Sequence, residues 1–145
     1  MNILLLNGPN LNLLGDRDTF YYGSHTIDDV YRDVRTAAIK LGVSVDFFQS
    51  NHEGALVDYI QGKLESCNGI MINAGALTHY GLSLKDAVLE AKAPIVEVHV
   101  SNIHSREEYR RHSVIEGIVV GQVAGLGWKG YSYALELLVN YIRGG

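Results

Sequence analysis

Short apolar runs, each about as long as a β-strand, alternate along this chain with longer segments of helical periodicity. Gly, Pro or Asn bounds each run, and the runs occupy residues 3–6, 43–48, 69–73, 94–100 and 117–124. Helical spacing of apolar side chains fills residues 26–41, 54–67, 83–91 and 131–143. Strands that alternate with helices favour a parallel sheet covered on both faces. The sequence therefore predicts one α/β domain over residues 1–145, a doubly wound five-stranded parallel sheet of flavodoxin-like order.

The first helical segment carries its own boundary signals. Thr26 can cap its start, and Gly42 can end it. Apolar residues recur between them at the spacing of one helix face, which predicts an amphipathic helix that packs on the sheet.

Composition and charge exclude several classes of protein. Hydrophobic residues make up 47% of the 145 residues and the net charge is −4, which argues against a disordered chain and against a surface for nucleic acid or anionic membranes. No apolar run approaches the roughly 20 residues that span a bilayer. The N-terminal segment lacks a basic leader, and the single Cys67 fits a reducing compartment. We therefore expect a cytoplasmic protein.

Polar residues gather where three of the predicted strands end. The first strand runs into "NGPN", the third into "NAGALTH" and the fourth into "HVSN". In open parallel sheets, ligands bind beyond the carboxyl ends of the strands, near the point where the strand order reverses. These three exits therefore predict a binding site at one edge of the sheet.

The fourth strand itself contains polar residues at alternate positions. Glu97, His99 and Ser101 alternate with valines inside the run, and "SREEYRRHS" follows at once. A solvated helix face explains much of the later charge, and this remains the favoured interpretation of Glu107, Glu108 and Arg111. The same interpretation does not explain a glutamate and a histidine within the strand. His104 and His112 are left open, with packing or a subunit contact favoured over chemistry.

The connection after the first strand is unusually long. Residues 8–25 show no clear period but contain Leu, Phe and Tyr, which predicts a functional lid rather than a disordered loop. Gly15 and Gly23 could act as its hinges. Arg17 precedes Tyr22 by five residues in this segment; taken alone, the pair would be a surface arginine and a partly buried tyrosine.

Other motifs are better explained by structure than by chemistry. "GLGWKG" at residues 125–130 has no second strand or acidic partner after it, so we interpret it as a tight strand-to-helix turn rather than a dinucleotide site. The histidines do not have metal-ligand spacing, and no G-x-S-x-G elbow is present. Asn7 and Asn73 stand where a phosphorylation receiver needs acidic residues. No lysine lies in a predicted strand, so an imine mechanism has no obvious carrier.

Long segments of the chain resemble the type II dehydroquinases (3-dehydroquinate dehydratases). They are "LNGPNLNLLGDRD", "YYGS", "QSNHEGALVDYI", "NAGALTHYGLSLKDA", "EVHVSNIHSREEYRRHS" and "GLGWKGYSYAL", in the family's order. The resemblance implies a flavodoxin-like fold, no metal or organic cofactor, and trimers packed into a dodecamer. It also implies removal of water from 3-dehydroquinate to give 3-dehydroshikimate, in the shikimate pathway or in quinate breakdown.

The resemblance also implies roles for residues of the chemical step. Tyr22 matches the general base that takes the proton from C2, and His99 matches the general acid that protonates the departing C1 hydroxyl. Arg17 matches the lid arginine, and Asn10 the residue that holds water near the developing enolate. Tyr21 is a neighbouring alternative to Tyr22, although the spacing to the following glycine favours Tyr22. Glu97 and Arg106 match supporting positions around the catalytic pair.

A second group of residues matches substrate contacts of the family. Asn73 and the backbone N–H groups of Val100 and Ser101 match a carboxylate cradle. Asp86 matches a residue that reaches the site of a neighbouring subunit. His79 and Arg110 match residues that contact the ring hydroxyls.

A dehydration next to a ketone requires residues of these kinds. A free tyrosine is almost wholly protonated at neutral pH, so a tyrosine base needs a cation beside it, such as Arg17. Hydroxide is a poor leaving group and needs a proton as it departs, which a histidine can supply. Two rival functions stay open: a flavin- or nucleotide-binding module, and a dehydratase or aldolase that works through a lysine imine.

Overall fold

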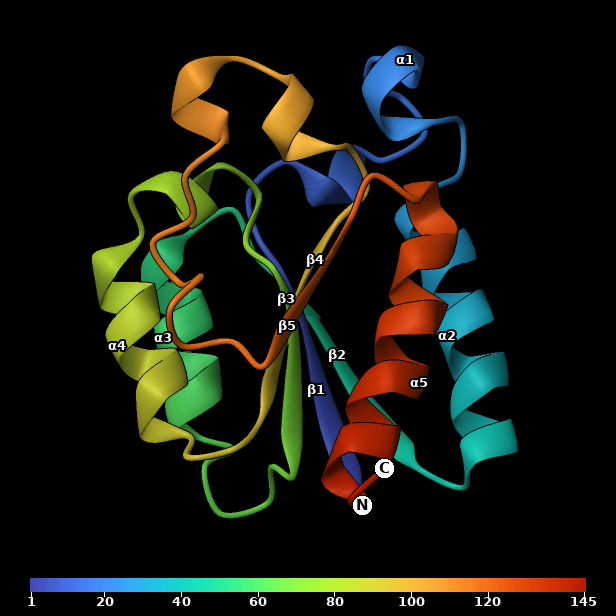
Figure 1. Cartoon of the computed structure of the whole chain (residues 1–145), viewed down its shortest axis with the longest axis vertical. Coiled ribbons are helices and arrows are strands. Elements are labelled where there is room, and N and C mark those ends of the chain that lie inside the picture. The colour runs from blue at the N-terminus through green and yellow to red at the C-terminus, as the bar shows by residue number, and fades with distance from the viewer.

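The computed structural model describes residues 1–145 and contains one parallel five-stranded sheet (Figure 1). The strand order is β2-β1-β3-β4-β5, which confirms the predicted doubly wound, flavodoxin-like arrangement. The order reverses after β1, so β1 and β3 lie side by side at the switch point. The strands are β1 (Asn2–Asn7), β2 (Ser44–Gln49), β3 (Gly69–Asn73), β4 (Ile95–His99) and β5 (Gly121–Ala124).

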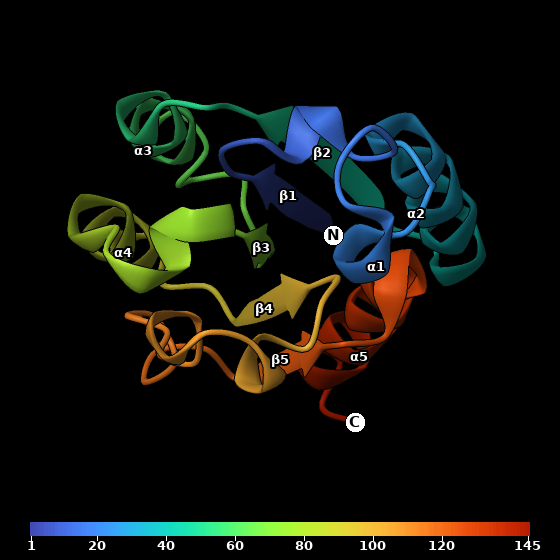
Figure 2. The ribbon, with the colours of Figure 1, turned by 90° about the horizontal axis from the view of Figure 1, so that it is seen from above.

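Two pairs of helices cover the two faces of the sheet, as Figure 2 shows from the carboxyl edge. On one face lie α2 (Ile27–Leu41) and α5 (Gly130–Ile142), and on the other lie α3 (Glu53–Gln61) and α4 (Leu82–Glu90). Each face buries its own cluster of apolar side chains. Burial on both sides explains why the strands have continuous apolar runs.

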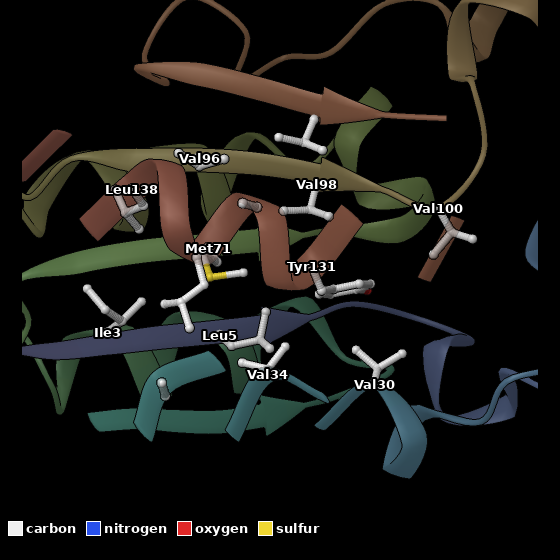
Figure 3. Packing of buried hydrophobic residues seen from close by; sticks show 14 of the residues in the cluster. Ile3, Leu5, Val30, Val34, Met71, Val96, Val98, Val100, Tyr131 and Leu138 are labelled. Atoms are coloured by element: carbon white, nitrogen blue, oxygen red, sulfur yellow. The ribbon is translucent and has the colours of Figure 1, made fainter. Parts of the chain in front are cut away.

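Alternation along β4 sorts its side chains between the two faces. Val96, Val98 and Val100 pack into the cluster on the α2–α5 face, as Figure 3 shows. Successive side chains of a strand point to opposite faces, so Glu97 and His99 project toward the other side. Both are nonetheless buried. The polar residues that interrupt this run are therefore interior groups, not solvated ones.

The boundary signals of α2 act as expected. Thr26 and Asp29 form a capping box, in which the Thr26 hydroxyl accepts from the Asp29 N–H and the Asp29 carboxylate accepts from the Thr26 N–H. Gly42 ends the helix in the left-handed conformation, at φ 65°.

Two element boundaries differ from the prediction by more than one residue. Strand β5 begins at Gly121, not at residue 117, because Ile115 is buried against the α3–α4 cluster and Ile118 and Val119 pack on it before the chain enters the sheet. Helix α3 ends at Gln61, not at residue 67, and turns lead from there to β3.

The long connection after β1 is ordered by short helical pieces. It contains a 3-10 helix at Leu11–Leu13 and the one-turn helix α1 (Thr19–Tyr22). Asp18 caps α1 by accepting from the Phe20 N–H, and Gly23 ends it at φ 69°. Figure 1 shows α1 above the carboxyl edge of the sheet, beside the segment that follows β4.

The glycine-rich segment after β5 is a turn, as predicted. Gly125 and Gly127 have φ angles of 82° and 67°, a left-handed conformation that favours glycine. A side chain at Gly125 would press on Asn102. The chain then enters α5 at Gly130. None of the helices combines the length and the apolar character that a bilayer crossing requires.

Candidate active site

A pocket of about 110 Å³ lies at the carboxyl edge of the sheet, under the connection of residues 8–25 that the sequence predicts to be a lid. Its walls come from the exits of β1, β3 and β4, from the lid, and from the segment after β4. All the predicted site residues line it except two, Glu97 and Asp86. The pocket is therefore built from segments far apart in the sequence, as the convergence of polar strand ends predicts.

Tyr22 is held in this pocket by two guanidinium groups. Arg17 donates from Nη2 to the Tyr22 Oη at 3.2 Å, and Arg106 donates from Nη1 to the same oxygen at 2.9 Å. The Arg17 guanidinium also lies over the Tyr22 ring, 4.0 Å from its centroid. Two charged donors therefore share one phenolic oxygen. The sequence indicated one such arginine, and the structure contains two.

Arg106 connects the lid to the strand beneath it. Its Nη1 also donates to the Ser101 hydroxyl at 3.3 Å, and its guanidinium lies 4.0 Å from the centroid of the Tyr21 ring. Burial lowers the pKa of the Arg106 guanidinium, but Tyr22, Glu107 and Tyr21 together outweigh burial and raise the pKa above its usual value. Tyr21 does not line the pocket, whereas Tyr22 does, which favours Tyr22 as the functional member of the pair.

His99 lines the pocket and forms a buried pair with Glu97, which does not. The His99 Nε2 lies 2.7 Å from the Glu97 Oε1. The other carboxylate oxygen accepts from the Ser113 hydroxyl at 3.0 Å and from the Gln122 amide at 3.1 Å. Burial raises the pKa of the Glu97 carboxyl, but these donors, the His99 imidazole first, outweigh it and hold the pKa below its usual value. The carboxylate is thus ionised, and it orients the imidazole so that Nδ1 is the ring nitrogen available to a ligand.

The exits of β3 and β4 present hydrogen-bond donors to the pocket. The Asn73 Oδ1 accepts from the Gly75 N–H at 3.2 Å. The backbone N–H groups of Val100 and Ser101 make no hydrogen bond to another protein group. Two free backbone donors beside an amide side chain suit a carboxylate. Asn10, at the exit of β1, is left-handed at φ 69°, and its N–H donates to the Asn51 side chain at 2.9 Å.

His79 and Arg110 complete the polar lining. The His79 Nδ1 lies 2.7 Å from the His112 carbonyl oxygen, which can only accept, so Nδ1 carries the proton and Nε2 can accept from a hydroxyl. Arg110 pairs with Glu107 at 2.9 Å. Both side chains line the pocket.

Asp86 lies elsewhere, exposed on α4 and outside the pocket lining. Its implied role needs a second subunit and stays a prediction. The charged residues after β4 are exposed but not simply solvated: Glu107 pairs with Arg110, and the Arg111 Nε donates to the Arg106 carbonyl at 3.1 Å. His104 lies 3.1 Å from the Gln122 Oε1, outside the pocket.

Several residues that shape the site were not predicted. Ser113, Gln122 and Tyr131 hold other site residues, and the pocket lining also includes Pro9, Leu11, Gly75, Ala76 and Ile103. Gln122 had a visible signal, because it is a polar residue inside an apolar strand run. The structure contains no group of three or more His, Cys, Asp and Glu side chains that could hold a metal ion.

Comparison with known proteins identifies the family of this chain. The family model described as "Dehydroquinase class II" matches residues 1–139. The chain is 47% identical over 143 residues to a 3-dehydroquinate dehydratase of Halothermothrix orenii, covering 99% of this chain and 97% of that protein. It is 49% identical over 140 residues to one of Herpetosiphon aurantiacus, covering 97% of each. A crystal structure of a type II dehydroquinase from Butyrivibrio crossotus superposes with a TM-score of 0.92 at 41% identity, covering 95% of this chain and 97% of that one. The chain therefore belongs to the class II dehydroquinase family.

Proposed function

We propose that this dehydroquinase removes water from 3-dehydroquinate to give 3-dehydroshikimate by anti elimination through an enolate, with Tyr22 as general base and His99 as general acid. The observation that carries the proposal is the Tyr22 hydroxyl between two guanidiniums, in one pocket with His99, whose imidazole pairs with the buried Glu97. The reaction serves the shikimate pathway or quinate breakdown.

The first step is removal of a proton from the carbon next to the ketone. The Tyr22 phenolate, stabilised by Arg17 and Arg106, takes the C2 proton and becomes a phenol. The electron pair of the C–H bond passes to the ketone oxygen and forms an enolate. Asn10 lies at the pocket wall, where its side chain can hold a water molecule against that oxygen.

The second step expels the C1 hydroxyl. The enolate collapses, the C1–C2 double bond forms, and the C1–O bond breaks. A protonated His99 gives its proton to the departing oxygen, so that water leaves rather than hydroxide. The ionised Glu97 stabilises the imidazolium that this step requires. Solvent then returns a proton to the imidazole and removes one from the phenol.

The remaining residues bind the substrate. The backbone N–H groups of Val100 and Ser101, together with the Asn73 amide, receive the carboxylate. The His79 Nε2 and the Arg110 guanidinium meet ring hydroxyls. These contacts exist before and after proton transfer, so they contribute mainly to substrate affinity.

The proposal extends to the assembly and its surroundings. The protein acts as a homo-oligomer, with trimers packed into a dodecamer, and Asp86 of one subunit reaches the site of its neighbour. It works in the cytoplasm on a small-molecule substrate, without a metal or organic cofactor and without a nucleic-acid or membrane partner.

One assay tests the proposed function directly. We expect chelator-treated protein to convert 3-dehydroquinate, with a rise in ultraviolet absorbance from the conjugated enone product. Tyr22→Phe should lose activity by about 1,000-fold or more, because it lacks the ionisable oxygen. Tyr21→Phe is the matched control and should keep most of the activity. Normal turnover by folded Tyr22→Phe would contradict the assignment of the base.

The same assay separates the rival functions. An imine mechanism predicts inactivation by borohydride in the presence of substrate, and we expect none. A binding module predicts a bound chromophore after purification together with no turnover of 3-dehydroquinate.

A further inference from the structure

Tyr131 is a fully buried tyrosine that the proposed chemistry does not use. It lies in the first turn of α5, and Figure 3 shows its ring among the valines of the core beneath the carboxyl ends of the strands. A phenylalanine would fill the same space, so the hydroxyl needs a separate explanation. A buried polar group is costly unless it is hydrogen-bonded.

The Tyr131 hydroxyl joins the two asparagines at the switch point of the sheet. It lies 2.7 Å from the Asn7 Oδ1 and 2.7 Å from the Asn73 Nδ2. These asparagines are register partners at the carboxyl ends of β1 and β3. The oxygen therefore reaches both strands where their order reverses.

These hydrogen bonds form a series that starts at Gly75, and the direction of each one follows from the bond before it. The Gly75 backbone N–H can only donate, so the Asn73 atom that faces it is Oδ1 and the amide nitrogen must face Tyr131. The Tyr131 oxygen accepts from the Asn73 amide nitrogen, and the Tyr131 hydroxyl donates its own hydrogen to the Asn7 Oδ1. The Asn7 amide nitrogen then donates to the Tyr31 hydroxyl at 3.3 Å.

We propose that Tyr131 is a positioning residue for substrate binding: it fixes the plane of the Asn73 amide so that the second N–H of that amide meets an anionic group in the pocket. The inference rests on the proposed function, which gives the ligand its carboxylate. Gly75 holds the oxygen of the amide and Tyr131 holds one N–H, so the other N–H is left for the ligand. Asn73 lines the pocket, whereas Tyr131 does not.

Burial keeps this arrangement constant over the working pH range. It raises the pKa of the Tyr131 hydroxyl well above that of a free tyrosine, so the group stays protonated. A protonated hydroxyl can donate to Asn7 and accept from Asn73 at the same time.

The test separates positioning from general stability. Because carboxylate binding acts in the ground state and the transition state alike, Tyr131→Phe should raise KM for 3-dehydroquinate by about tenfold or more with kcat changed less than about threefold. Tyr31→Phe is the matched control, because it removes the hydroxyl at the far end of the same series of hydrogen bonds. It should leave KM unchanged. In a Tyr131→Phe/Asn73→Ala double variant, KM should be no higher than in Asn73→Ala alone.

A second measurement needs no catalysis. Hydrogen exchange of the Asn73 side-chain N–H that faces Tyr131, followed by NMR, should be slow in the wild-type protein and in Tyr31→Phe, and fast in Tyr131→Phe. Fast exchange in the wild-type protein, or an unchanged KM in folded Tyr131→Phe, would overturn the inference while leaving the proposed function intact. Absence of turnover by the wild-type protein would overturn the proposed function, and the exchange measurement would still decide whether Tyr131 positions Asn73.

Discussion

At the residue scale, the site depends on a buried carboxylate that accepts hydrogen bonds on both of its oxygens. Glu97 has no exposed surface, yet its carboxylate accepts from an imidazole, a hydroxyl and an amide. The strand alternation predicted that Glu97 and His99 share a face. It could not predict Ser113 or Gln122 as partners, because those contacts depend on how β5 and the segment before it pack beside β4.

The pKa of Glu97 leads to a prediction about stability and pH. Because this pKa is lower in the folded protein than in the unfolded chain, the unfolded chain binds more protons between the two values. The stabilisation is therefore present above the ordinary glutamate pKa and is lost as the pH falls through the lowered value. We expect the free energy of unfolding to decrease more between pH 7 and acid for the wild-type protein than for Glu97→Gln, measured by denaturant titration.

Glu108→Gln provides the control for this pH experiment. Glu108 is exposed, and its side chain makes no ion pair or hydrogen bond, so its variant should follow the wild-type curve. At neutral pH, Glu97→Gln should be less stable than the wild-type protein by about 1–3 kcal/mol, because buried donors lose a charged acceptor. Parallel pH curves for the wild-type protein and Glu97→Gln would contradict the buried, ionised state of this carboxylate.

The second arginine on Tyr22 gives another prediction at this scale. Arg106→Met removes one of the two charged donors that hold the phenolic oxygen of the proposed base. We expect kcat/KM to fall by about 10- to 100-fold, as for loss of a charge-assisted hydrogen bond. Arg32→Met, on the exposed surface of α2, should leave kcat/KM unchanged. An unchanged kcat/KM in folded Arg106→Met would contradict a role for this second donor at the proposed base.

At the element scale, the sequence predicted the order and type of the regular elements better than their ends. Apolar runs with helical segments between them defined all five strands and four main helices, because burial on both faces imposes continuous apolar strands. The start of β5 was missed because residues 117–119 are as apolar as a strand but cover the α3–α4 cluster instead. The one-turn helix α1 has no periodic signal at all, and its cap at Asp18 becomes recognisable only in the folded lid.

The exits of β1 and β3 approach so closely at Gly8 that a methyl group added there should have a large effect. A side chain at Gly8 would overlap the backbone carbonyl of Ala74, just beyond β3. Backbone cannot move aside as a flexible side chain can, so Gly8→Ala should separate the exits of β1 and β3. We expect a loss of about 1–3 kcal/mol in the free energy of unfolding together with a large loss of activity.

A glycine in a helix provides the matched control for this experiment. Gly54 lies exposed in α3, where an added Cβ meets nothing within 4 Å. Gly54→Ala should stabilise the protein by about 0.4–1 kcal/mol and leave activity unchanged, because alanine restricts the unfolded chain. Thermal unfolding and the dehydration assay compare the two variants. A Gly8→Ala protein as stable and active as Gly54→Ala would show that the two exits can move apart without consequence.

At the scale of the whole molecule, the functional groups concentrate at one edge of the sheet. The lid, the strand exits and the segment after β4 gather there, and Figure 1 shows both chain ends at the opposite edge. Parallel connectivity explains this division, since each strand delivers its carboxyl end to the same side. Asp86 is the one predicted site residue that lies away from this edge of the sheet, because it is exposed on α4.

The proposed role of Asp86 can be tested by mixing two inactive proteins. If each site takes Tyr22 from its own subunit and Asp86 from a neighbour, Tyr22→Phe and Asp86→Ala subunits can form intact sites together. Random assembly of equal amounts gives an intact site where an Asp86→Ala chain lies beside a Tyr22→Phe chain, which is about a quarter of all sites. We therefore expect a mixture that is unfolded and refolded together to regain up to about that fraction of wild-type activity, whereas each variant refolded alone stays nearly inactive. Mixing without unfolding is the control, because mixed sites cannot form unless subunits exchange. No gain after joint refolding, with assembly verified by light scattering, would mean that every site is complete within one chain.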